Sequence, residues 1–247
     1  MVYIVRDLCV GCGKCAVYCP VQAIIPGEKA FIDQEKCVEC STCIRAGCPV
    51  DALRQPHLKP PRLVRKLFSD PLARFDQTDV PGRGTEEMKT NDVTNNFDHG
   101  EVGWGVELGR PGVSTKFVDV EKVAMAVARH GVRFTDLNPV SMILDYSTGR
   151  FTEDNPWKID PSSIRRLRSL SAIIEFKTPI EKIPEVIGSL REVSKEIDTV
   201  FSIGVITRWS DGVMEVTSYL ESAGVEPRPN GKHNVGLGRR GYTQEGS

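Results

Sequence analysis

The sequence predicts an α+β protein in which a small, cysteine-organised domain precedes a larger sandwich of helices and sheet. All eight cysteines of the 247-residue chain lie between Cys9 and Cys48, a density that indicates a covalent or metal-bound framework. The middle of the chain is polar and irregular, and from residue 101 onward strand-like and helix-like hydrophobic patterns alternate. We therefore expect three consecutive parts: a domain at 1–55, a linker or docking loop at 56–100, and an α+β sandwich at 101–247.

The cysteines form two matching motifs, each followed by a proline. They read Cys9-x2-Cys12-x2-Cys15-x3-Cys19 and Cys37-x2-Cys40-x2-Cys43-x4-Cys48. The agreement extends beyond the sulfurs, because Val10 matches Val38 and Ala23 matches Ala52. This internal repeat predicts two similar half-units that fold against each other.

Three chemistries compete for these cysteines. A disulfide framework fits their number, but the protein is expected to be cytosolic, and cysteines two residues apart do not readily pair. Zinc usually takes two separated pairs per site, whereas each half offers a tight triplet and a distant fourth thiolate. A cubane [4Fe–4S] cluster fits both halves, because three closely spaced thiolates can hold three irons while the other half supplies the fourth ligand. The layout favours clusters.

Through these paired motifs, residues 1–55 resemble a bacterial-type two-cluster ferredoxin. The resemblance implies two [4Fe–4S] clusters, one held by Cys9, Cys12, Cys15 and Cys48, and the other by Cys37, Cys40, Cys43 and Cys19. The second motif has one extra residue before its last cysteine, which Gly47 can absorb as a bulge. Since every ligand is a thiolate, we expect low-potential one-electron centres. Tyr3 and Phe31 occupy equivalent places in the halves and are expected to pack over the clusters.

The segment 56–100 has two interpretations. Pro60 and Pro61 interrupt regular structure, and a short basic amphipathic helix is expected over 62–68. The polar run that follows is either a solvated tether or a docking loop, with Arg83, Lys89 and Asp92 as its polar contacts.

The cysteine-free region predicts five strands and three helices. Strands are expected over 102–108, over 132–144 with an interruption at 138–139, over 171–176 and over 200–207. Helices are expected from an Asp119 cap to Gly131, over 180–197 behind a Thr178–Glu181 capping box, and over 211–223, with Val225 starting a closing strand. This order predicts a split-βαβ sandwich with an appended α-β unit. It resembles ferredoxin-like folds such as the ACT-like regulatory modules, a likeness that does not fix function.

Residues 106–112 and 235–241 agree at five of seven positions. Both stretches carry a Gly-Arg turn after a strand-like run. They are either ordinary glycine turns or the two halves of an anion or partner site, in which Arg110 and Arg239 bind a carboxylate or phosphate.

The composition indicates which partners to expect. The chain has 32 basic and 33 acidic side chains and a net charge of -1, so nothing favours nucleic acid or an anionic membrane. No stretch approaches the roughly 20 apolar residues of a membrane span. The first residues lack the basic and apolar regions of a signal peptide. We expect a cytoplasmic protein with no membrane span and no nucleic-acid partner.

Electron transfer is the function that these features favour. We expect an iron–sulfur protein or subunit that passes low-potential single electrons to a redox partner protein, such as a flavoprotein or a larger oxidoreductase subunit. The C-terminal domain would dock that partner or form an oligomer. No nucleotide-binding loop or nucleophile motif is present, so no catalytic residue is assigned and an electron-transfer subunit is favoured over a free-standing enzyme.

Two alternatives remain. Residues 82–92 and 230–239 resemble the ferredoxin-bearing part of 6-hydroxynicotinate reductase-like proteins. That resemblance implies a component of a ring-reducing enzyme, whose C-terminal domain binds substrate or partner. The ACT-like order of elements instead suggests a redox-linked ligand-sensing module.

Overall fold

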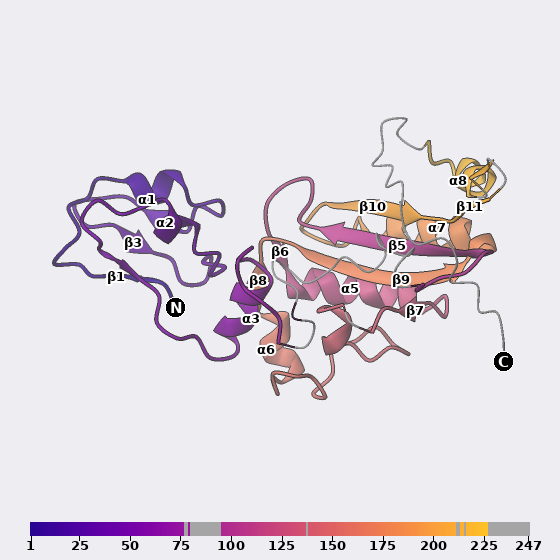
Figure 1. Ribbon diagram of the computed structural model, residues 1–247, viewed down its shortest axis with the longest axis horizontal. Coiled ribbons are helices and arrows are strands. Elements are labelled where there is room, and N and C mark those ends of the chain that lie inside the picture. Colours follow the sequence, from indigo (N-terminus) through magenta and orange to yellow (C-terminus); the bar gives the residue numbers. More distant parts are fainter. Residues whose placement is uncertain (77–78, 80–94, 137, 211–212, 215, 227–247) are drawn as a thin grey trace.

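The computed structural model describes residues 1–76, 79, 95–136, 138–210, 213–214 and 216–226. In Figure 1 an N-terminal part made of short elements is joined, through helix α3 (Arg62–Leu67), to a C-terminal part in which helices pack on a sheet. The mixed helix and strand content agrees with the predicted α+β class. Within the described residues, no helix has the length and apolar character needed to cross a membrane.

The N-terminal part contains the internal repeat as two β-α-β units. The first unit is β1 (Tyr3–Ile4), α1 (Lys14–Val17) and β2 (Ile24–Ile25), and the second is β3 (Phe31–Ile32), α2 (Thr42–Arg45) and β4 (Leu53–Arg54). Strand β1 pairs with β4, and β2 pairs with β3, both antiparallel. Each unit therefore pairs only with the other, which interlocks the halves around a small core formed by Val2, Cys9, Ile24, Ala30, Ile32, Ala52 and Leu53.

The expectation that Tyr3 and Phe31 pack over the clusters is wrong. Tyr3 is 46% exposed and Phe31 is 60% exposed. Successive side chains of a strand point to opposite faces. Since the neighbours Val2 and Ile32 are buried in the core, both aromatic rings face outward.

Helix α3 belongs to the core of the C-terminal part. Val64, Leu67 and Phe68 are buried there, and Phe75 joins them further along the chain. The ring of Phe68 meets those of Phe75 and Phe117 edge to face, with centroids 5.7 Å and 5.0 Å away. The helix predicted over 62–68 is thus present, and it is packed in the core of the C-terminal part.

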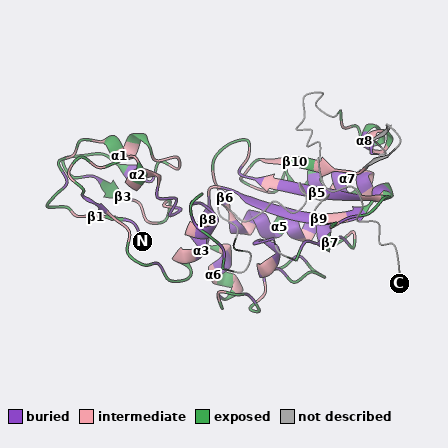
Figure 2. Ribbon diagram, viewed as in Figure 1, coloured by how far each residue is buried: buried purple, intermediate pink, exposed green. Residues whose placement is uncertain are grey.

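A four-stranded sheet forms the centre of the C-terminal part. Its strands are β5 (Glu101–Leu108), β7 (Arg133–Phe134), β9 (Ala172–Pro179) and β10 (Phe201–Ile206), in the order β10-β5-β9-β7, and every neighbouring pair is antiparallel. Trp104 and Phe176 face each other across β5 and β9, and their rings stack with centroids 5.7 Å apart. Figure 2 shows that β5 and β9 are largely buried.

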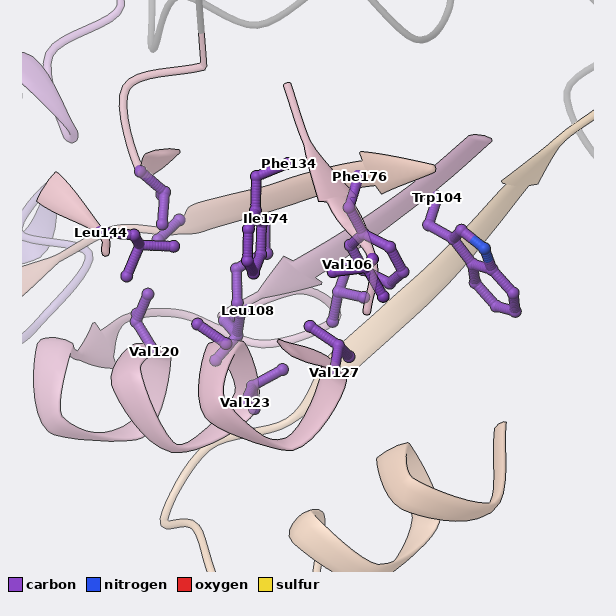
Figure 3. Close-up of a cluster of buried hydrophobic side chains, with 14 of the residues drawn as sticks. Trp104, Val106, Leu108, Val120, Val123, Val127, Phe134, Leu144, Ile174 and Phe176 are labelled. Carbon is purple, nitrogen blue, oxygen red and sulfur yellow. The ribbon is translucent and has the colours of Figure 1, made fainter. Parts of the chain in front are cut away.

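Two helices complete this core. Helix α5 (Phe117–Ala128) packs beneath the sheet, and Figure 3 shows its residues Val120, Val123 and Val127 directed at the strands. Helix α7 (Ile183–Val193) contacts α5 and buries its own apolar side in the same cluster. The segments between carry β6 (Thr115–Lys116), paired with β8 (Arg168–Ser169), a 3-10 turn η2 (Ser141–Ile143) and α6 (Pro161–Arg165).

Several expected elements differ from the structure. The strand predicted over 140–144 is the turn η2, because the side-chain oxygen of buried Asn138 accepts hydrogen bonds from the backbone N–H groups of Val140 and Ser141. Helix α5 is capped by Lys116, and Asp119 lies buried within its first turn. Thr178 does not cap the next helix, since its hydroxyl accepts a hydrogen bond from the indole N–H of Trp104 at 2.9 Å.

The helix predicted at 180–197 is divided and shorter. It begins as a 3-10 turn η3 (Ile180–Lys182), and α7 follows with a proline in its first turn. The helix predicted at 211–223 is also shorter. A hairpin of β11 (Trp209–Ser210) and β12 (Val213–Met214) precedes α8 (Thr217–Ser222). Val225 lies outside any strand, and residues 227–247 are outside the described residues.

Candidate iron–sulfur site

The two short helices of the N-terminal part present the cysteines. Cys15 lies in α1 and Cys43 lies in α2, and the other cysteines lie in the loops around them. A residue in the left-handed region precedes each helix, Gly13 with φ 72° and Ser41 with φ 58°. This left-handed turn reverses the chain between the second cysteine of each motif and the helix that carries the third.

One cavity collects cysteines from both motifs. Five cysteines line it. Four are those that the resemblance assigns to the first cluster, Cys9, Cys12, Cys15 and Cys48, and the fifth is Cys43, which the resemblance assigns to the second cluster. Apolar residues such as Ile4, Ala30 and Leu53 form the rest of its wall. Three thiols of one half-unit and the last thiol of the other therefore border the same enclosed space.

Backbone amides hydrogen-bond to three sulfurs. The N–H of Ala23 donates to Cys19 Sγ at 3.2 Å, and the N–H of Ala52 donates to Cys48 Sγ at 3.3 Å. These two bonds are equivalent in the repeat, because each links the last cysteine of a motif to the alanine four residues later. Hydrogen bonds from amides stabilise thiolate ligands and tune the potential of a cluster.

The third amide–sulfur bond lies at Cys9. The N–H of Ala30 donates to Cys9 Sγ at 3.5 Å, while the ammonium group of Lys29 donates to the carbonyl oxygen of Cys9 at 2.6 Å. The backbone hydrogen bonds from Ala30 and Gly11 hold the pKa of Cys9 below its usual value. A low thiol pKa favours the thiolate, the form that binds iron.

The two cysteine trios have different surroundings. In the first trio Cys12 is exposed, whereas its counterpart Cys40 is buried. Burial is the main cause that raises the pKa of Cys37 to about 11 and that of Cys43 to about 12. Cys37 and Cys43 are therefore protonated as free thiols near neutral pH, and binding of iron there displaces protons.

Helix α3 supports the second trio from outside. The guanidinium group of Arg65, which is 7% exposed, donates to the carbonyl oxygens of Gln34 at 3.1 Å and Cys37 at 3.0 Å, and also to that of Arg166 at 3.5 Å. Arg62 donates to the same carbonyl of Cys37 at 3.4 Å. Two cations thus contact the loop that enters the second motif, and one of them links it to the C-terminal part.

A buried carboxylate completes this support. Glu39, between Cys37 and Cys40, is fully buried and accepts hydrogen bonds from the N–H of Val2 at 3.0 Å and from Arg62 at 3.0 Å. The roles of Glu39, Arg62 and Arg65 were not predicted from the sequence. The only signal was the basic face of the helix predicted over 62–68, beside a glutamate inside a cysteine motif.

All eight cysteines are free of disulfide bonds in the structure. Within the described part of the chain, no three histidine, cysteine, aspartate or glutamate side chains form a group that could hold a metal ion. The features that favour a cluster are therefore the eight thiols, the cavity shared by the two motifs and the amide–sulfur bonds.

The predicted anion site is not assembled in the described residues. Arg110 forms an ion pair with Glu107, with 3.2 Å between Nη1 and Oε2. Arg239 lies outside the described residues, as do Arg83, Lys89 and Asp92 of the predicted docking loop. The pairing of Arg110 with Arg239 stays a prediction.

Comparison with known proteins identifies the N-terminal part. Residues 2–25 match the 4Fe-4S binding domain family. The protein named Ferredoxin 7Fe from Hydrogenibacillus schlegelii is 38% identical over 56 residues, which are 22% of this chain and 70% of that protein. The chain belongs to the ferredoxin family. The predicted iron–sulfur ferredoxin domain is confirmed at this level.

Two further relatives show how far the similarity extends. Ferredoxin-1 of Caulobacter vibrioides is 40% identical over 57 residues, 22% of this chain, and the chain spans 50% of its length. One component of an ion-translocating oxidoreductase complex from Methanosarcina acetivorans is 50% identical over 46 residues, 18% of this chain and 17% of that component. No solved structure matches the chain. These similarities cover only about a fifth of this ferredoxin.

Proposed function

We propose that this ferredoxin is an electron-transfer protein or subunit that carries two [4Fe–4S] clusters and passes single electrons to a partner oxidoreductase. The observation that carries the proposal is the cavity bordered by three thiols of the first motif and by Cys48 of the second. One cluster would be held by Cys9, Cys12, Cys15 and Cys48, and the other by Cys37, Cys40, Cys43 and Cys19.

The repeat supports the second ligand set. Cys19 accepts an amide hydrogen bond from Ala23 in the same way that Cys48 accepts one from Ala52. Because the half-units pair only with each other, the last cysteine of each is brought toward the trio of the other. The place of Cys48 beside the first trio therefore supports Cys19 as the fourth ligand of the second trio.

When bound, the clusters supply reversible one-electron chemistry at low potential, since all the proposed ligands are thiolates. The chain contributes the environment. The buried wall residues Ala30 and Leu53 keep water from part of the cavity. The amides of Ala23, Ala30 and Ala52 donate hydrogen bonds to sulfurs, and Arg62 and Arg65 place positive charge beside Cys37. Positive charge near the second trio favours its reduced form.

The surface around the first motif supports a protein partner. Val10 is 62% exposed and Val17 is 82% exposed, and both lie within two residues of a proposed ligand, as does Tyr18 at 51%. Exposed apolar residues grouped on a small surface are typical of partner sites. We propose that a flavoprotein or larger oxidoreductase subunit docks here, beside exposed Cys12, where a cluster would lie nearest to solvent.

We also propose that the C-terminal part is a split-βαβ sandwich and that the chain divides at 1–55 and 101–247. The strand order β10-β5-β9-β7, with β5, β7, β9 and β10 as first to fourth strands, supports this fold. The bridging helix α3 would then belong to the second domain by its packing. Such a domain would bind a partner protein or a second copy of this chain.

The ring-reduction alternative gains no specific support, and the sensing alternative stays a prediction. The residues that carry the resemblance to 6-hydroxynicotinate reductase-like proteins, 82–92 and 230–239, lie outside the described residues. That resemblance and the cytoplasmic location stay predictions.

Electron paramagnetic resonance of anaerobically purified protein tests the proposal. Wild type should contain about eight iron and eight sulfide per chain, as two cubanes require. Cys48→Ser should impair the same signal as Cys9→Ser, and Cys19→Ser should impair the signal that Cys37→Ser impairs. Metal analysis showing zinc, or a Cys48→Ser effect on the signal that depends on Cys37, would contradict the assignment.

A further inference from the structure

A second cavity, of about 210 Å³, lies where the N-terminal and C-terminal parts meet. Val21, two residues after Cys19, closes it from the N-terminal side. The opposite wall comes from β6 and the loop before it, the start of α5, strand β8 and the loop before β10. Its polar residues are Ser114, Thr115, Lys116, Asp119, Arg168, Asp198 and Thr199. In Figure 1, β6 and β8 lie at the end of the C-terminal part that is nearest to the N-terminal part. Since a water molecule takes up about 30 Å³ in the liquid, the cavity has room for a small organic molecule.

Asp119 in this cavity lacks a partner for one oxygen. The residue is 3% exposed, and the backbone N–H of Asp198 hydrogen-bonds to its carboxylate. The other oxygen, Oδ2, is buried with no hydrogen-bond partner among the described residues. Burial is the main cause that raises the pKa of Asp119 above its usual value, and the nearby charges of Lys122 and Lys116 offset this only in part. Buried polar atoms in native proteins are nearly always satisfied, so an unpaired acceptor in a cavity indicates a donor that fills it.

A hydroxyl group beside Asp119 is in the same state. Ser114 Oγ is buried and has no hydrogen-bond partner in the described part of the chain. Its backbone carbonyl, by contrast, accepts a hydrogen bond from the hydroxyl of Thr199 at 3.2 Å. The loop is therefore held by its backbone, while the Ser114 side chain remains available to a ligand.

The cations of the cavity differ in availability. Lys116 is engaged, because its ammonium group lies 2.9 Å from a carboxylate oxygen of Asp198. Arg168 lines the same cavity and, among the described residues, no ion pair or hydrogen bond of its guanidinium group is found. The cavity thus offers one available guanidinium and one available carboxylate oxygen.

We propose that this cavity binds a small α-amino acid, with the ligand carboxylate on Arg168 and the ligand ammonium group on Asp119 and Ser114. A zwitterion matches the available pair charge for charge. A guanidinium group suits a carboxylate because it donates two parallel hydrogen bonds. The ammonium group supplies the donor that both unpaired oxygens lack. A simple carboxylate would leave Asp119 Oδ2 without a donor, and a simple amine would leave Arg168 without a counter-charge.

Isothermal titration calorimetry on the anaerobic, cluster-loaded full chain tests the proposal. Each of the twenty common L-amino acids is titrated separately, and at least one should bind. Ethylamine and propionate, which carry only one of the two charged groups of L-alanine, should bind about tenfold or more weakly than the best amino acid. The comparison needs no variant, so it stays decisive if a substitution prevents folding.

Variants locate the site. Asp119→Asn keeps the side-chain shape and Arg168→Gln removes the guanidinium group, and each should weaken binding about ten- to a hundredfold. The control Arg166→Gln changes an arginine whose side chain, among the described residues, makes only an exposed hydrogen bond to Ser163, so binding should be unchanged. The proposal is overturned if no amino acid binds, if propionate or ethylamine binds as tightly, or if Asp119→Asn and Arg168→Gln both bind like wild type.

Discussion

Two glycines within the first cysteine motif provide a matched test of how the loop of Cys9 is held. Gly11 and Gly13 both have left-handed backbones, with φ 67° and 72°. A Cβ at Gly11 would lie 2.5 Å from the carbonyl oxygen of Gly27 and 2.6 Å from that of Glu28, whereas a Cβ at Gly13 would meet nothing within 4 Å. Gly11→Ala therefore pushes the 27–28 turn away, and Gly13→Ala leaves it in place.

The expected magnitude follows from these contacts. Either alanine costs roughly 1–2 kcal/mol for the left-handed backbone. Gly11→Ala costs about 1–3 kcal/mol more, because the crowded atoms are backbone and cannot turn aside. This difference corresponds to about 5- to 150-fold in an opening equilibrium. The displaced turn also carries Lys29 and Ala30, which donate to the carbonyl oxygen and to the sulfur of Cys9.

The assay is anaerobic release of iron to a chelator, followed by visible absorbance, with electron paramagnetic resonance to identify the cluster that is lost. Release through local opening follows the opening equilibrium, so Gly11→Ala should lose iron about 5- to 150-fold faster than Gly13→Ala. The loss should be confined to the cluster proposed at Cys9. Equal release rates in the two variants, or loss of the cluster proposed at Cys37 first, would refute the reasoning.

Three further predictions concern other parts of the molecule. Arg65→Met removes hydrogen bonds to the carbonyls of Cys37 and Arg166, and it should lower the free energy of unfolding by about 1.5–3 kcal/mol in urea titrations; an unchanged midpoint and slope would contradict this. Because protons compete with iron at thiols of raised pKa such as Cys37 and Cys43, release of iron from the cluster proposed at Cys37 should quicken as the pH falls below neutral, and a pH-independent rate would count against it. Gly149→Ala places a Cβ against the backbone of α5 at φ 70° and should lower stability by about 2–5 kcal/mol in thermal or urea unfolding, which a wild-type unfolding curve would disprove.

The sequence predicted best where a short local pattern determines the outcome. The spacing of the cysteines requires neighbouring thiols, and the family match over residues 2–25 confirms the kind of domain. Strands β5, β9 and β10 lie close to their predicted ranges, because each is a hydrophobic run bounded by polar or glycine residues.

Prediction failed where one side chain overrides a local pattern. The apolar run at 140–144 resembles a strand, but buried Asn138 holds it as a turn and also donates to the carboxylate of Glu175 on β9. Tyr3 and Phe31 suggested core positions by their equivalent places in the two halves of the repeat, whereas strand alternation turns them outward. Neither effect is visible without knowing which face of each strand meets the core.

Contacts across the chain were the least predictable part of the candidate site. Arg65 lies 28 residues from Cys37 and 101 residues from Arg166, and nothing in the sequence shows that one guanidinium group contacts both carbonyls. The cavity at Asp119 is similar, because its walls come from distant segments. A cap residue was a reasonable interpretation of Asp119 until its neighbours were known.

The arginines of α3 determine where this ferredoxin can be cut. A fragment ending at residue 55 would keep every cysteine, yet it would lack Arg62 and Arg65. The carbonyl oxygen of Cys37 would then accept hydrogen bonds from water in place of these two guanidinium groups. Midpoint potentials measured on such a fragment would describe a wetter and less positive environment for the cluster proposed at Cys37 than the intact chain provides. A truncated form meant to keep these contacts needs α3 together with the C-terminal core in which Val64 and Leu67 are buried.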